Sequence, residues 1–145
     1  MSTDAAHDTY VQEEPTRLRT LSVTLLALLL AQVLLGLANT FWLELPESGS
    51  GWKAAQPMML LNAHMALGLV TVVGAAWATA RAIRGRHRAW TALSTTGVLG
   101  TVVALASGIG FMGHVADDTL SFLMGAGTVV AIGAYAWGLA LRTPR

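Results

Sequence analysis

The sequence predicts an all-α fold, a four-helix transmembrane bundle with up-down-up-down topology. Two observations predict it. Of the 145 residues, 54% are hydrophobic and 12% are charged, whereas charged residues make up about a quarter of soluble domains. The charges are also clustered, and four stretches without any are each longer than the roughly 20 apolar residues that a membrane-spanning helix needs. These stretches are residues 21–43, 57–80, 89–113 and 119–141.

The predicted elements follow one another with short connections. Residues 1–16 are polar and show no helical periodicity, so we expect a disordered cytoplasmic tail there. Residues 17–145 then form the four-helix transmembrane domain. The first apolar stretch is longer than the core of a secretory signal, and no small-residue cleavage pattern follows it, which predicts a retained helix. Because the connections are short, neighbouring helices are expected to pack antiparallel.

The basic residues predict the orientation. All nine except Lys53 lie next to the same ends of the predicted helices, and the positive-inside rule assigns that side to the cytoplasm. Both termini are therefore predicted to be cytoplasmic. The strong bias toward Arg, together with abundant Ala and Gly, favours a bacterial origin, so we expect a multi-pass protein of the bacterial plasma membrane. The residues on the predicted inner side are Arg17, Arg19, Arg81, Arg84, Arg86, Arg88, Arg142 and Arg145.

Composition narrows the classes of function. A net charge of +1 lacks the basic excess that nucleic-acid binding requires. The sequence has no cysteine, which excludes disulfides, thiolate zinc sites and iron–sulfur ligation. The apolar stretches carry no paired carboxylates and the sequence has no phosphate-binding loop, so an enzyme is not favoured. The predicted partner is the lipid bilayer, and a homodimer or a larger membrane complex is compatible with the sequence.

His64 is the histidine that lies within a predicted span, about 10 Å from the outer end of its helix. Polar groups inside a bilayer are costly and are candidates for function. Gly68 follows four residues later on the same helix face, where it would leave room for a haem whose iron His64 binds. The alternative is a neutral histidine that forms a hydrogen bond to a neighbouring helix, at Asn39 or Gln32.

Two polar residues and a glycine share one face of the first predicted helix. Gln32, Gly36 and Asn39 are separated by four and three residues, which is the spacing of a helix face. Buried amides in a membrane either bind a partner helix or orient a ligand. Both interpretations stay open at this point.

Two further patterns concern helix packing. Small residues recur every four positions on the third predicted helix, which favours either a close helix contact or a flat wall against a planar cofactor. They are Gly100, Ala104 and Gly108. A weak internal repeat is also present, since residues 37–39 are similar to 105–107, and residues 61–68 are similar to 120–127. The repeat favours a duplicated helical hairpin.

Several residues qualify as further ligands. Met124 lies at a depth close to that of His64, and a His/Met pair holds the haem iron in some cytochromes. His114, or the His64 of a second copy, are the alternatives for the sixth ligand. Thioether and imidazole groups also suit Cu(I), so a copper site is a further alternative. Its ligands would be His64, Met65 and Met124, with Met112 and His114 as additional candidates.

The segments around these residues resemble one helical hairpin of the haem A synthase family. Hairpins of that family carry a Gln-x-x-Leu-Gly helix followed by a helix with an intramembrane histidine. Gln32-Val33-Leu34-Leu35-Gly36 matches the first element and His64 matches the second. The family has two four-helix halves, each binding a b-type haem between two histidines. The resemblance therefore implies a half-sized relative that binds one haem b or has lost it.

The chain also departs from the family pattern. Leu123 stands where the repeat would place a second histidine, and no acidic residue stands near His64. The paired outer cysteines are missing as well. Haem A synthesis is therefore not expected, even with a shared fold.

These observations leave three kinds of function open. The first is a module that binds one haem b near the outer face, for electron transfer or haem handling. The second is a ligand-free accessory or assembly subunit of a membrane complex, such as a respiratory one, with a Cu(I)-handling protein as a further alternative. The candidate cofactor-binding residues are His64, Met124, His114, Gln32, Gly36, Asn39 and Gly68, and the candidate metal ligands are His64 and Met124.

Overall fold

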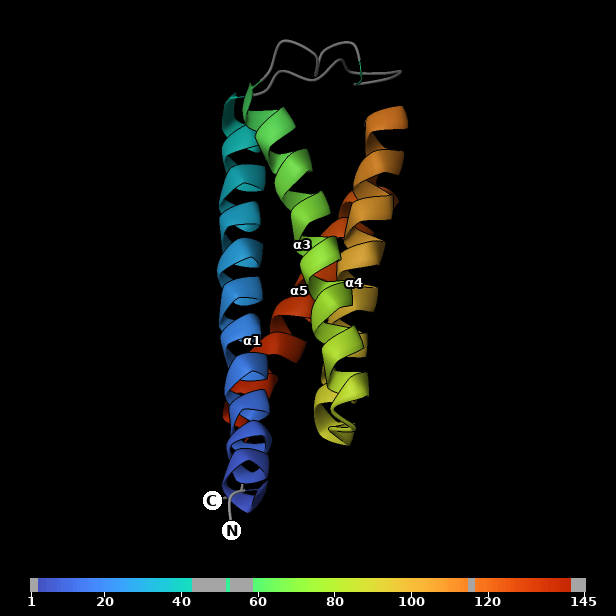
Figure 1. Cartoon of the computed structure of the whole chain (residues 1–145). Helices are drawn as coiled ribbons and strands as arrows, with labels where there is room; N and C mark the ends of the chain where they lie inside the picture. Colours follow the sequence, from blue (N-terminus) through green and yellow to red (C-terminus); the bar gives the residue numbers. More distant parts are fainter. Residues whose placement is uncertain (1–2, 43–51, 53–58, 115–116, 142–145) are drawn as a thin grey trace.

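A computed structural model describes residues 3–42, 52, 59–114 and 117–141 of the chain. Its helices form a bundle (Figure 1), and each contains a segment long and apolar enough to cross a membrane. The predicted all-α, four-helix fold is therefore confirmed. The helices are α1 (Thr3–Trp42), α3 (Met59–Arg84), α4 (Arg88–Gly113) and α5 (Asp118–Ala140).

The helix bounds agree with the predicted spans to within two residues, except at the start of α1 and at the end of α3, which continues to Arg84. Helix α1 begins at Thr3, within the segment for which we expected a disordered tail, and its apolar part is Thr16–Phe41. The physical reason is that the costly step in helix formation is nucleation, whereas extension of an existing helix costs little. Residue 43 of the first predicted span and residues 57–58 of the second lie outside the described residues, as do Lys53, Arg142 and Arg145.

Consecutive helices pack side by side, and α5 returns against α1 to close the bundle. In Figure 1, α5 runs obliquely behind the other helices, from beside α4 to beside the lower half of α1. The start of α1 and the end of α5 lie at the same end of the bundle (Figure 1). We call this the Arg-rich end, because Arg17, Arg81, Arg84 and Arg88 belong to it. Which side of a membrane it faces stays a prediction.

The contact face of α1 repeats every 3.5 residues on average. Such a repeat keeps one helix face against its neighbour in a left-handed supercoil. Helix α3 shows the same alternation of three- and four-residue steps. The two faces oppose each other, since Gly36 of α1 lies against His64 of α3 and Gly68 of α3 lies against Gln32 of α1. The α1 positions are Leu18, Ser22, Leu25, Leu29, Gln32, Gly36 and Asn39, and the α3 positions are Leu61, His64, Gly68, Thr71, Ala75, Ala78 and Ala82.

Small side chains fill the centre, while large apolar side chains face outward. Ala75, Ala82 and Ala131 are completely buried. By contrast, Leu34 is 66% exposed and Val129 is 68% exposed. Membrane bundles pack in this way, because small residues let helix backbones approach and lipid tails solvate the large ones. The distribution supports a lipid bilayer as the environment.

The backbones of α4 and α5 come into contact at two glycines. A Cβ on Gly100 would lie 2.6 Å from the carbonyl oxygen of Gly127, and a Cβ on Gly127 would lie 2.6 Å from the carbonyl oxygen of Gly100. Ala104 and Ala131 stand one turn away on each side of this contact. We call these four residues the glycine crossing. The small-residue stripe of α4 therefore lies in a helix–helix contact.

The turn from α3 to α4 has a backbone conformation that favours glycine. Arg86 has a φ of 56°. The His87 N–H donates to the carbonyl of Ala82 at 3.2 Å, and the Arg86 N–H donates to that of Ile83 at 3.0 Å. This is the pattern of a Schellman C-cap with Arg86 at the left-handed position. The turn positions the Arg-rich end of α4 directly after α3.

Candidate functional site

The imidazole of His64 lies on the backbone of α1. Its Cε1 is 3.3 Å, and its Nδ1 3.8 Å, from the position that a Cβ on Gly36 would occupy. The ring also interacts with the main chain at Gln32. A side chain at Gly36 would make this contact tighter than nearly all real Cβ contacts, so the glycine favours the close approach of the ring. His64 is thus directed toward α1, as the helix-packing alternative predicts.

A reciprocal contact lies one turn away. The Gln32 side-chain amide of α1 covers Gly68 of α3, with Nε2 2.7 Å from the position of a Cβ there. Each helix therefore contributes one polar side chain and, four residues later, one glycine. Each polar side chain fills the space over the other helix's glycine. We call Gln32, Gly36, His64 and Gly68 the polar crossing.

The two crossings occupy equivalent places in the two hairpins. In the internal repeat, Gln32 corresponds to Gly100 and Gly68 corresponds to Gly127. Gln32 faces Gly68 in the first hairpin, and Gly100 faces Gly127 in the second. The glycine crossing brings two backbones together, whereas the polar crossing places side chains between them. Polar side chains thus act as spacers between α1 and α3.

Two buried nitrogen atoms near the polar crossing have no hydrogen-bond partner. They are Nδ1 of His64 and Nδ2 of Asn39, and Asn39 is 8% exposed. A buried polar atom without a partner costs free energy because it has lost its bonds to water. Two residues of the predicted α1 face therefore contact α3: Gln32 contacts Gly68, and Gly36 contacts His64. The third, Asn39, is buried, and its amide nitrogen has no hydrogen-bond partner.

The two other candidate ligands lie elsewhere. The Met124 sulfur is 3.4 Å from the position of a Cβ on Gly108, so it packs between α4 and α5. His114 is exposed at the end of α4, where its N–H donates to the carbonyls of Gly110 and Phe111. His64 instead lies between α1 and α3. The structure therefore does not join these side chains into one ligand set.

Part of the proposed copper set does come together. Met65 packs against Leu61 and Met112, near the end of the bundle opposite the Arg-rich end. His64 and Met124 lie at other interfaces. Within the part of the chain that the structure describes, no group of three or more His, Cys, Asp or Glu side chains is placed to hold a metal ion.

The residues around His64 do not fit a haem in this arrangement. A porphyrin needs an open apolar recess beside its axial ligand. The two recesses that the glycines of the polar crossing create are filled by the His64 ring and the Gln32 amide. A haem at His64 would therefore require both side chains to move.

Sequence analysis missed a second cluster, near the Arg-rich end. The Tyr135 ring lies on Gly97, with its Cζ 2.5 Å from the position of a Cβ there. Trp90 of α4 and Ser22 of α1 lie against Gly138 of α5. A tyrosine in an apolar helix resembles an ordinary interfacial aromatic residue, so the sequence offers little to distinguish this cluster.

Comparisons with protein-family models, curated proteins and solved structures found no match to this chain. The resemblance to the haem A synthase family therefore stays a prediction.

Proposed function

We propose that this chain is a ligand-free structural module of the membrane, an accessory or assembly subunit of a larger membrane complex. The observation that carries the proposal is the polar crossing. His64 and Gln32 are the side chains best suited to hold or orient a cofactor, and both are used in helix packing. Their role is to set the spacing of α1 and α3, and thereby the outer shape of the first hairpin.

The wide apolar surface agrees with such a role. Large side chains face outward along every helix, for example Val23 and Leu34 on α1 and Phe122 on α5. A bundle of this kind contacts lipid or other transmembrane helices without losing its own small-residue core. A homodimer would use the same surface.

One observation favours haem b as a second candidate. The buried Nδ1 of His64 has no hydrogen-bond partner, and coordination of a metal by this nitrogen would satisfy it. In that case the Gln32 amide would have to leave Gly68 to make room for the haem. The His64 of a second copy would supply the other ligand, because Met124 packs between α4 and α5. The chemistry that haem b would supply is one-electron transfer. Copper at the Met65 and Met112 pair is the remaining alternative.

The proposal is tested in native membranes. A tagged chain is produced at its natural expression level, crosslinked and extracted in mild detergent. The mass of the complex that contains it is then measured by native mass spectrometry. We expect it in a species heavier than a homodimer, with fixed stoichiometry. The His64→Phe variant, which keeps a flat ring over Gly36, should assemble equally well. Recovery of monomers or homodimers alone would refute the proposal.

The same membranes test the orientation. Cysteines introduced at Arg86, in the turn between α3 and α4, and at Asp118, at the start of α5, are treated with an impermeant thiol reagent. The distribution of basic residues predicts labelling of position 118 from outside the cell and of position 86 only after permeabilisation. The reverse pattern would contradict the predicted cytoplasmic location of both termini.

A further inference from the structure

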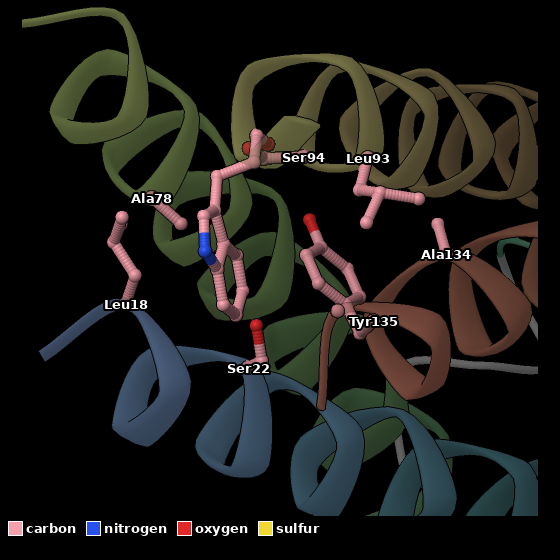
Figure 2. Close-up of a pocket in the computed structure, with 9 residues that line it drawn as sticks. Leu18, Ser22, Ala78, Leu93, Ser94, Ala134 and Tyr135 are labelled. Atoms are coloured by element: carbon pink, nitrogen blue, oxygen red, sulfur yellow. The ribbon is translucent and has the colours of Figure 1, made fainter. Parts of the chain in front are cut away.

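A pocket near the Arg-rich end is lined by all four helices. Its walls include Leu18 and Ser22 of α1, Ala78 of α3, and Ser94 of α4, with Tyr135 of α5 closing it. Figure 2 shows the Ser22 hydroxyl pointing into the pocket and the Tyr135 ring reaching from α5 toward Ser94. Hydroxyl-bearing residues of three helices thus line one small space together with apolar side chains.

The Tyr135 hydroxyl is the unexplained group in this pocket. Tyr135 is 2% exposed, and its hydroxyl oxygen has no hydrogen-bond partner. Gly97 leaves the room that the phenol occupies, since a Cβ there would lie 2.7 Å from the hydroxyl oxygen. An apolar environment makes an unpartnered hydroxyl costly. Phenylalanine would fill the same space without that cost.

The hydroxyls of Ser94 and Ser22 can each form a further hydrogen bond. The Ser94 hydroxyl donates to the carbonyl of Trp90 on its own helix, which leaves its oxygen able to accept a hydrogen bond. Ser22 is 4% exposed, and its hydroxyl can donate and accept. Each of these groups comes from a different helix than Tyr135, so one bridging molecule would connect several helices.

The volume of the pocket indicates which molecule could bind in it. The cavity measures about 10 Å³, about the space that one buried water requires. A buried water needs two to four polar partners, and such waters are typical where polar groups would otherwise be unsatisfied. We propose that a single structural water occupies this pocket and bridges the Tyr135 hydroxyl to Ser22 and Ser94.

The bridging water would link α1 and α5, two helices that are not consecutive in the chain. Helices α1 and α5 are the first and last of the bundle, and they meet beside this pocket, where Ser22 Oγ lies 3.5 Å from the position of a Cβ on Gly138. A water held by Ser22 and Tyr135 links these two helices through hydrogen bonds at a depth where lipid supplies none. The water therefore closes the ring of helices at the Arg-rich end.

Thermal unfolding of the purified chain in lipid nanodiscs tests the inference. If water bridges the hydroxyls, Tyr135→Phe should lower Tm by about 2–4 °C. Ser22→Ala should also lower Tm, and the double variant should lose less than the sum, because both single variants break the same bridge. Tyr135→Phe combined with Thr96→Val should be additive, since Thr96 is exposed and bonds to Ala92 on its own helix.

Two results would overturn the inference. One is a Tm for Tyr135→Phe equal to or above that of the wild type, which means that the hydroxyl lacked a partner. The other is additivity of the Tyr135 and Ser22 variants. Independently, a structure at a resolution that shows waters should contain one within hydrogen-bond distance of the Tyr135 hydroxyl oxygen. An empty pocket there would also exclude the bridge.

Discussion

Gly68 and Gly127 hold equivalent places in the two hairpins but meet different kinds of atoms. A Cβ on Gly68 would meet the flexible Gln32 amide at 2.7 Å, whereas a Cβ on Gly127 would meet the carbonyl oxygen of Gly100 at 2.6 Å. A side-chain end moves at low cost, but a carbonyl oxygen moves only with its helix. The two hairpins therefore differ in how much extra volume they tolerate.

This difference predicts that the same substitution costs more stability at Gly127 than at Gly68. Gly127→Ala should destabilise the bundle by about 1–3 kcal/mol, because the added methyl forces α4 and α5 apart. Gly68→Ala should change the free energy of unfolding by less than about 1 kcal/mol, since Ala is also the better helix former. The measurement is unfolding in mixed micelles. Gly133→Ala serves as the control, because nothing lies within 4 Å of its Cβ position. Equal losses at Gly68 and Gly127 would contradict the distinction.

Substitutions of His64 distinguish the contribution of the ring's volume to stability from that of its nitrogen atoms. His64→Phe keeps a flat ring over Gly36. It loses the interaction with the main chain at Gln32 but also removes an unpartnered buried nitrogen, so its free energy of unfolding should stay within about 1 kcal/mol of the wild type. His64→Ala removes the ring and should cost about 1–3 kcal/mol, because it leaves an unfilled space between α1 and α3. If both variants lost the same stability, the nitrogens rather than the ring would be what matters.

Asp117 stabilises the start of α5. Its carboxylate accepts hydrogen bonds from the backbone N–H of Thr119 at 2.9 Å and of Leu120 at 3.2 Å. Asp117→Ala should therefore cost about 1 kcal/mol of stability, while Asp117→Asn should retain most of it, because Asn also caps helices well. Chemical denaturation of the two variants checks this. A similar loss in both would mean that charge rather than capping is responsible.

The left-handed residue at the end of α3 predicts a stabilising substitution. Arg86 adopts a φ of 56°, which costs a residue with a Cβ about 1 kcal/mol relative to glycine. Arg86→Gly should therefore raise the free energy of unfolding by up to about 1 kcal/mol. Arg86→Ala is the matched control, because it removes the same charge and keeps the Cβ. If the free energy of unfolding rose as much in Arg86→Ala as in Arg86→Gly, the backbone conformation would not be the cause.

The fold could be predicted because charge and apolar length determine it directly. The charge-free stretches coincide with the apolar helices, since only a continuous apolar segment lies comfortably in lipid. The α1 extension from Thr3 was not predicted, because its stability depends on the adjoining apolar helix rather than on its own composition.

The candidate site was predicted in part. Spacing alone placed Gln32 with Gly36, and His64 with Gly68, on common helix faces. The two faces oppose each other because of the register between α1 and α3. The spacing of residues within one helix does not determine this register. For the same reason, depth along the helix suggested a Met124 partner that lies at another interface. The capping role of Asp117 follows a sequence pattern, an Asp just before an apolar helix.

The absorption spectrum of the purified protein tests the central claim most directly, namely that His64 packs against Gly36 rather than binding a cofactor. The chain is expressed in haem-replete cells, and the wild type is compared with His64→Phe by reduced-minus-oxidised spectra and haem content. Both proteins should lack an α band and hold far less than one haem per chain. A sharp α band with one haem per chain in the wild type, lost in His64→Phe, would contradict the claim.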